Sequence, residues 1–186
     1  MNPKELFEKC LKQSTDTVLL VNDEDVLRPT PDTEWDVRQL VAHMLYELSW
    51  VPDILGGKTV SEVGRKYDGD LLGDDISRAW QAAAARALSS VNDVDVNRTI
   101  HLTYGDFPAQ HFIREQANDQ LVHAWDLGTA LGVRVVFDVA VAEDLYLTAV
   151  PRKQELAASG LFAAPVAVSE SADIQTKLLA LLGRLS

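Results

Sequence analysis

The chain has 186 residues, of which 47% are hydrophobic, and its formal net charge at pH 7 is -11. This composition is typical of a globular protein rather than a disordered one, and the excess of acid argues against binding to nucleic acid or to an anionic membrane, which both require a positive surface. The N-terminal stretch MNPKELFEKC has no apolar run, and no stretch approaches the roughly 20 apolar residues of a membrane span, so we expect a cytoplasmic protein.

The first half of the chain predicts three helices. Over residues 2–21, Asn-Pro fits an N-cap followed by a first-turn proline, and apolar residues then recur at helical spacing. The second helix begins with a D-V-R-Q capping box at residues 36–39 and closes at Gly-Gly of residues 56–57. Pro52 should kink or end it. The third helix covers residues 76–91, where alanines and larger apolar residues alternate with polar ones at the same period.

The next elements are a strand and a long helix. Residues 97–104 (NRTIHLTY) alternate and are rich in β-forming residues, so they predict a short strand, with GDFP of residues 105–108 as a turn. A fourth helix is predicted over residues 109–131, and Gly132 suits the position that follows its last turn.

The last part of the chain adds two helices. After VRVVF, Asp138 should open a fifth helix that Pro151 bends, and Asp173 should cap the last one. The sequence contains no internal repeat and no clear linker. We therefore expect a single, mostly helical all-α domain over residues 1–186.

The stretch DQLVHAWDLGTALG, residues 119–132, combines apolar residues with an acid and a histidine. At about 100° per residue, Asp119 and His123 lie on one ridge of the fourth helix, a turn apart, and Asp126 lies close to the same face. The helix is apolar almost all round, so these side chains should be buried, which costs free energy unless they are paired or bound to a metal. Two interpretations stay open: an Asp–His hydrogen bond within the core, or two metal ligands on adjacent turns.

A metal site needs a third ligand from elsewhere in the chain, and His43 is the best candidate among the four histidines. It lies in VRQLVAHMLYELSWV at the edge of the second helix's apolar stripe, and Glu47 and Trp50 share its flank. From a helix that faces the fourth one across a bundle, His43 could meet Asp119 and His123. Alternatively it is an exposed histidine at the boundary of the core.

The remaining polar and aromatic candidates have simpler explanations. His101 points away from the apolar face of its strand and should be solvated, whereas His111 is either a substrate-site residue or ordinary polarity at a helix end. Cys10 is the only cysteine, which excludes an internal disulfide, and its place on an apolar face predicts packing rather than nucleophilic attack. The tryptophans are expected to be core and bundle-end anchors, with Trp50 and Trp125 also able to wall a pocket: Trp35, Trp50, Trp80 and Trp125.

Three segments, TPDTEWDVRQLVAHM, LSWVPDILGGK and DQLVHAWDLGTALG, resemble the metal-binding domain of mycothiol-dependent maleylpyruvate isomerases, within the DinB-like superfamily. The tail APVAVSESADIQTKLLALLGR is similar to the end of single-domain members. The resemblance implies a DinB-like four-helix bundle with additional short helices and a short β-hairpin, without the isomerases' second domain, and a homodimer. It also implies a divalent metal held by His43, Asp119 and His123; the isomerases carry glutamate at the position of Asp119.

Two imidazoles and one carboxylate leave open coordination positions, which is typical of a catalytic metal rather than a structural one. Zinc or nickel is the metal that we expect, and such an ion can hold a thiol as thiolate. The resemblance implies mycothiol or a similar low-molecular-weight thiol, with transfer to, or isomerisation of, a small electrophile. Two other functions stay open: a hydrolase that uses metal-bound water, and a non-catalytic metal-binding protein of stress response or regulation.

Overall fold

The structure is a computed structural model and describes residues 1–32, 35–154 and 163–185. The chain divides into two compact units, Asn2–Val135 and Val136–Ser186, and Met1 belongs to the latter. The expectation of one domain over residues 1–186 therefore stays a prediction. Among the described residues, no helix combines the length and the hydrophobicity that crossing a membrane requires.

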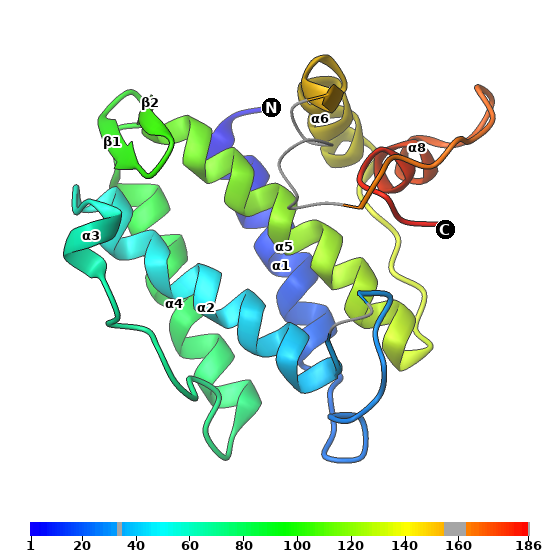
Figure 1. Cartoon of the computed structure of the whole chain (residues 1–186), viewed down its shortest axis with the longest axis horizontal. Helices are drawn as coiled ribbons and strands as arrows, with labels where there is room; N and C mark the ends of the chain where they lie inside the picture. The colour runs from blue at the N-terminus through cyan, green and yellow to red at the C-terminus, as the bar shows by residue number, and fades with distance from the viewer. Residues whose placement is uncertain (33–34, 155–162, 186) are drawn as a thin grey trace. The chain divides into compact units, whose positions relative to one another are not determined.

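Four long helices build the first unit, and together they form the predicted all-α bundle (Figure 1). Around this bundle, α1 packs against α5 and α4, and α2 packs against the same two helices, so that α1 and α2 are diagonal neighbours. Their apolar faces form a core in which large side chains such as Trp80 are fully buried. The helices are α1 (Pro3–Val18), α2 (Val37–Leu55), α4 (Ile76–Asp93) and α5 (Ala109–Leu131).

The ends of α1 and α2 follow from capping groups that the sequence displays. The Asn2 side chain accepts a hydrogen bond from the first turn of α1, which ends at Val18 instead of residue 21. Asp36 and Gln39 form the predicted reciprocal capping box, and it fixes the start of α2 at Val37, six residues before His43. Pro52 does not end α2 at once: it lies in the last turn, and the helix continues to Leu55.

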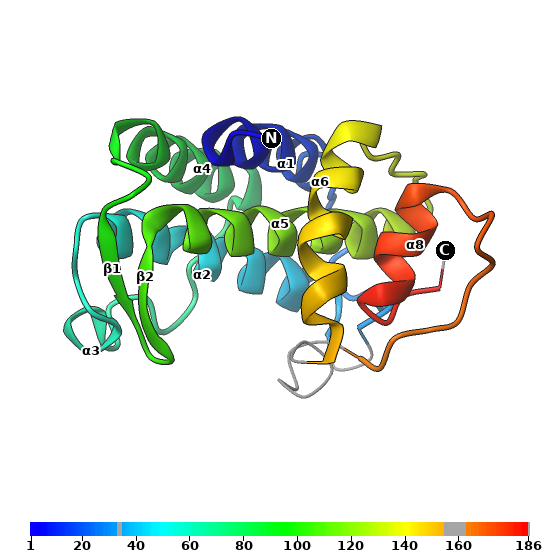
Figure 2. The ribbon, with the colours of Figure 1, turned by 90° about the horizontal axis from the view of Figure 1, so that it is seen from above.

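A β-hairpin leads into α5, as Figure 2 shows. Its strands are β1 (Thr99–Leu102) and β2 (Gly105–Pro108), which pair antiparallel. The prediction of GDFP as a turn is wrong: these four residues are the second strand, and the turn lies at residues 103–104. Gly105 has a φ of 143°, a backbone conformation that glycine adopts readily, and it lets the chain enter β2 directly.

One short helix of the first unit lay outside the sequence prediction. This helix, α3 (Val60–Val63), has four residues, too few for a hydrophobic period to show. Its start nevertheless carries a signal, because Thr59 and Glu62 form a second capping box.

The second unit contains α6 (Val139–Ala149), the 3-10 helix η1 (Val150–Arg152) and α8 (Ile174–Leu181). Asp138 and Asp173 are the N-caps of α6 and α8, as predicted. Pro151 lies in η1, where the α-helix gives way to tighter turns. Residues 155–162 lie outside the described residues, so a helix that continues beyond the bend at Pro151 stays a prediction.

Candidate metal centre

The inner face of α5 carries a row of polar side chains directed at α2. Gln116, Asp119, Gln120 and His123 follow each other at spacings of three, one and three residues, which places them on one side of the helix. Gln120 is fully buried, and its Nε2 donates a hydrogen bond of 3.2 Å to the carbonyl oxygen of Met44 on α2. The two helices are thus joined at this level by a polar contact within the core.

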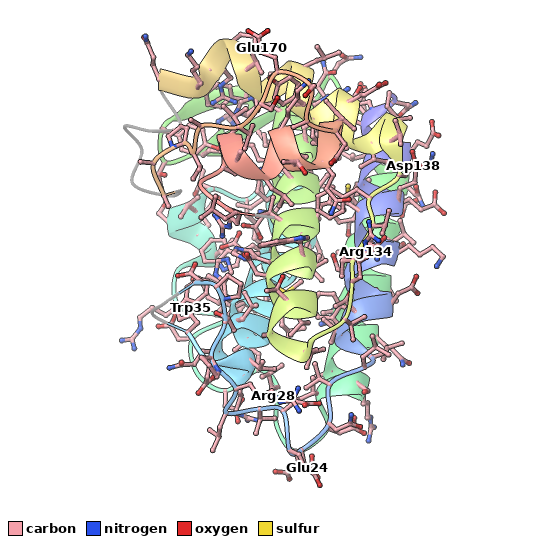
Figure 3. The ribbon with its side chains drawn as sticks, turned by 90° about the vertical axis from the view of Figure 1, so that its right-hand side faces the viewer. Glu24, Arg28, Trp35, Arg134, Asp138 and Glu170 are labelled. Atoms are coloured by element: carbon pink, nitrogen blue, oxygen red, sulfur yellow. The ribbon has the colours of Figure 1, made fainter. Side chains whose placement is uncertain are left out.

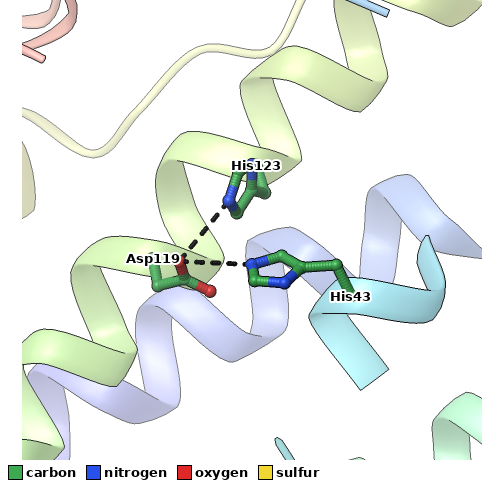
Figure 4. Close-up of side chains that lie close together, drawn as sticks. All are labelled: His43, Asp119 and His123. Carbon is green, nitrogen blue, oxygen red and sulfur yellow. Dashed lines mark ion pairs between the residues drawn. The ribbon is translucent and has the colours of Figure 1, made fainter. Parts of the chain in front are cut away.

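His43, Asp119 and His123, called the His–Asp–His cluster below, converge between α2 and α5 (Figure 4). One ligand atom from each residue lies within 4.8 Å of the others. Asp119 Oδ1 lies 3.7 Å from His43 Nε2 and 3.4 Å from His123 Nε2. The prediction that His43 meets the other two residues across the bundle is confirmed in its geometry. About a quarter of the His43 and Asp119 side chains stays exposed, so part of the cluster is accessible to solvent.

The charges of the cluster support one another. Burial would raise the pKa of Asp119, but the ion pairs with His123 and His43 outweigh it and hold that pKa well below its usual range. Burial would likewise lower the pKa of His123, yet hydrogen bonds and charges from Asp119 and Asp126 raise it to about 9. At neutral pH without a metal, Asp119 is therefore ionised and His123 carries a proton that a metal would have to displace.

Asp126 is fully buried and contacts the other side of the His123 ring. Its Oδ2 lies 3.0 Å from His123 Nδ1. A carboxylate in this position fixes the ring so that Nδ1 carries hydrogen and Nε2 is directed at Asp119. Of the two roles considered from the sequence, orienting His123 or capping a helix, this contact supports the first.

One buried oxygen of Asp119 fits a bound cation. Asp119 Oδ2 is buried and has no hydrogen-bond partner, whereas both histidines approach Oδ1. An unsatisfied buried carboxylate oxygen is costly, and a metal ion would satisfy it. Together with two imidazole nitrogens, the Asp119 carboxylate completes the donor set of an open divalent site. The residues present therefore fit a divalent metal.

Trp35 lies in the segment that precedes α2, where Figure 3 labels it, and its ring packs on the cluster. Its ring stacks on His43 with centroids 4.6 Å apart, and its centroid lies 5.9 Å from that of His123. Of the two tryptophans expected to wall a pocket, Trp50 instead contacts the rings of Tyr46 and Tyr67. The sequence indicated only an anchor role for Trp35, because its contact with His43 depends on how the chain turns into α2.

A second polar pair lies beside the cluster. Gln116 Nε2 donates a hydrogen bond of 2.9 Å to Glu47 Oε2, so the pair joins α5 to α2. The sequence placed Glu47 on the flank of His43, but Gln116 was missed. The available signal was its spacing, three residues before Asp119 on the same helical face.

The other two histidines lie away from the cluster. His101 is exposed on β1 and its Nδ1 lies 2.7 Å from Asp106 Oδ1, as expected for a solvated histidine. His111 stacks on Phe107 with ring centroids 4.3 Å apart, and its Nε2 lies 3.0 Å from Glu115 Oε1. These contacts account for His111 at the start of α5, without a role in the cluster.

Residues 7–128, which include all three cluster residues, match the family model of the mycothiol maleylpyruvate isomerase N-terminal domain. The chain belongs to this family. Two uncharacterised proteins from two strains of Mycobacterium tuberculosis, MT0763 and Rv0738, are each 32% identical to it over 119 residues. The match covers 61% of the present chain and spans 59% of the length of those relatives.

A solved structure shows the same fold. It is the crystal structure of a histidine-to-alanine mutant of the mycothiol-dependent maleylpyruvate isomerase, with a TM-score of 0.66 and 16% sequence identity. The likeness covers 92% of this chain and 76% of that one. At this identity it concerns the fold alone, and it confirms the DinB-like helical bundle for this member of the mycothiol maleylpyruvate isomerase N-terminal domain family.

Proposed function

We propose that this protein binds a divalent metal, zinc or nickel, through His43, Asp119 and His123, and uses it to activate a low-molecular-weight thiol similar to mycothiol. The activated thiol would be transferred to a small electrophile or would assist its isomerisation. The observation that carries the proposal is the convergence of one ligand atom each from His43, Asp119 and His123, beside a buried Asp119 oxygen that has no hydrogen-bond partner. Membership of a family described by mycothiol-dependent isomerisation supports the choice of thiol.

The chemistry of a bound divalent ion would be to stabilise a thiolate at neutral pH, where a free thiol of pKa about 8.5 is mostly protonated. The protein's own residues prepare this chemistry. Asp119 supplies the negative charge of the site, and Asp126 fixes the orientation of the His123 ring. Trp35 covers the face of His43 and restricts its rotation. The exposed quarter of His43 and Asp119 gives the thiol and the electrophile access.

The thiol has to come from outside the chain. Cys10 is fully buried on α1 among the core residues, as its apolar setting predicted. A thiol in this position contributes to packing and is not accessible to a substrate. We also propose a homodimer in solution, as the family resemblance implies, which light scattering coupled to size-exclusion chromatography would test.

Metal content is the first test of the proposal. Purified wild type should hold about one divalent ion per chain by elemental analysis, since three ligands define one site. His43→Ala and His123→Ala should lose most of it. His101→Ala is the matched control, because it removes an exposed histidine far from the cluster and should leave the metal content unchanged. Equal trace metal in all four proteins would contradict the site.

Thiol dependence is the second test. A panel of small electrophiles would be assayed with and without mycothiol, using wild type, Cys10→Ala and His123→Ala. We expect thiol-dependent turnover in wild type and Cys10→Ala and none in His123→Ala. Metal-dependent turnover without thiol would instead identify a hydrolase. Full metal occupancy with no turnover under any condition would identify a non-catalytic metal-binding protein.

A further inference from the structure

The pair of Glu47 and Gln116 lies one helical turn from the His–Asp–His cluster on both helices. Glu47 follows His43 by four residues on α2, and Gln116 precedes Asp119 by three residues on α5. Both spacings keep side chains on the same helical face. The hydrogen bond of 2.9 Å from Gln116 Nε2 to Glu47 Oε2 shows that the two faces meet here, as they do at the cluster.

This pair presents hydrogen-bond acceptors that lack donors. Gln116 is 6% exposed, and its Oε1 is buried without a hydrogen-bond partner. In the described part of the chain, the Glu47 carboxylate accepts its hydrogen bond from Gln116, at Oε2. Leaving a buried acceptor unsatisfied is energetically unfavourable. A ligand that donates hydrogen bonds at this position would remove that cost.

The electrostatic environment of the pair disfavours anions. The pKa of Glu47 is raised, because burial and the charge of Asp119 outweigh the Gln116 hydrogen bond and the imidazoles of His43 and His123, which lower it. Across residues 1–32, 35–154 and 163–185, neither Glu47 nor Asp119 forms an ion pair with a lysine or an arginine. In the proposed complex, Asp119 and the bound thiolate offset the two positive charges of the metal, so a carboxylate of a ligand would meet the charge of Glu47 and no lysine or arginine.

We propose that Glu47 and Gln116 are specificity-determining residues, which bind hydrogen-bond donor groups of the small thiol and exclude thiols that carry a carboxylate near the sulfur. The thiol sulfur would lie at the His–Asp–His cluster, and its hydroxyl or amide groups would contact this pair. The site would thus take neutral, hydroxyl-bearing thiols. This inference rests on the proposed function, because it assumes that the cluster holds the sulfur.

The test compares two thiols of similar length on cobalt-loaded protein. Mercaptopropanol ends in a hydroxyl and mercaptopropionate in a carboxylate, and binding of either sulfur to Co²⁺ is read from the thiolate-to-cobalt absorption band. We expect wild type to bind mercaptopropanol about tenfold or more tightly than mercaptopropionate, because like charges repel in the binding site. In Glu47→Gln, which has the same shape without the charge, the ratio should fall to about threefold or less. Glu8→Gln, an exposed acid on α1, is the control and should keep the wild-type ratio.

The outcomes separate this inference from the proposed function. Equal affinity of wild type for both thiols would overturn the role of the pair, and this measurement does not depend on the folding of any variant. An unchanged preference in folded Glu47→Gln would overturn it as well. If cobalt is bound but neither thiol produces the band, or if no cobalt binds, the proposed function itself is wrong.

Discussion

Asp119 is the residue on which the cluster depends, because both histidines approach the same oxygen atom. In a metal-free bundle this arrangement is a buried ion pair with His123, and the pair has a defined pH dependence. A raised histidine pKa stabilises the folded state fully below the unfolded value of 6.5, and this contribution is lost as pH rises through about 9. The lowered pKa of Asp119 acts at the other end: its contribution is present above the unfolded value of 3.8 and is lost in stronger acid.

The same protons compete with the metal, which yields the first prediction. Because His123 has to lose its proton before Nε2 can bind a metal, the affinity for Zn²⁺ should increase as pH rises from 6.5 to about 9. One competing proton corresponds to about a tenfold change in affinity per pH unit. Competition with a chromophoric chelator at several pH values measures this slope. A Zn²⁺ affinity that does not change over this range would contradict the protonated state of His123.

Asp126 gives a prediction about positioning. Asp126→Asn keeps the size of the side chain but removes the charge that holds His123, so metal affinity should fall by about 10–100-fold. Chelator competition measures the change, with circular dichroism to verify that the helices remain. Asp106→Asn is the matched control, since Asp106 contacts a histidine, His101, on the exposed hairpin. Equal affinity for Asp126→Asn and wild type would show that Asp126 does not support the site.

At the scale of single residues, the sequence predicted the candidates that repeat a helical spacing and missed those that depend on tertiary contacts. Asp119 and His123 are four apart on one helix, so their proximity follows from helical geometry. His43 could only be nominated, because its meeting with them depends on how α2 packs against α5. Trp35 and Gln116 show the same limit: their partners lie on another segment of the chain.

At the scale of elements, prediction was best where a helix has a clear stop signal. The bounds of α5 agree with the sequence prediction, because Pro108 precedes its start and Gly132, with a φ of 72°, takes the left-handed conformation at its end. A short β-hairpin was expected, but the residues of β2 were assigned to its turn because Gly and Pro in GDFP are typical of turns. Pairing with β1, which puts Phe107 opposite buried Ile100, decided the conformation instead.

The C-terminal end of α5 packs so tightly at Gly128 that a larger side chain there should destabilise the fold. A Cβ on Gly128 would lie 2.3 Å from Val135 Cγ2 and 3.0 Å from the carbonyl oxygen of Val133. Gly128→Ala should therefore lower the free energy of unfolding by about 1–3 kcal/mol, as expected for overpacking. Urea denaturation measures this, and adding Val135→Ala should restore part of the loss by making room. Thr129→Ala, at an exposed position beside it, is the control; a loss as large there would mean that steric crowding is not the cause.

At the scale of the whole molecule, the pattern of apolar faces predicted the all-α class, and the family segments predicted the DinB-like bundle that the solved isomerase structure shares. What the sequence left open is whether the cluster is a metal site or a core ion pair. Both alternatives bury the same residues in the same fold. They differ in how the stability of the protein responds to metal.

A metal that binds the folded chain and not the unfolded one stabilises it by mass action. With free Zn²⁺ at about 1,000 times its dissociation constant, the free energy of unfolding should increase by about 4.1 kcal/mol, and excess chelator should reverse the change. The measurement is a thermal or urea unfolding curve with and without Zn²⁺ for wild type, His43→Ala and His101→Ala. Wild type and His101→Ala should be stabilised and His43→Ala should not, because only the latter loses a ligand of the cluster. Stabilisation of all three would mean that Zn²⁺ binds elsewhere, and stabilisation of none would leave Asp119 and His123 as a core ion pair.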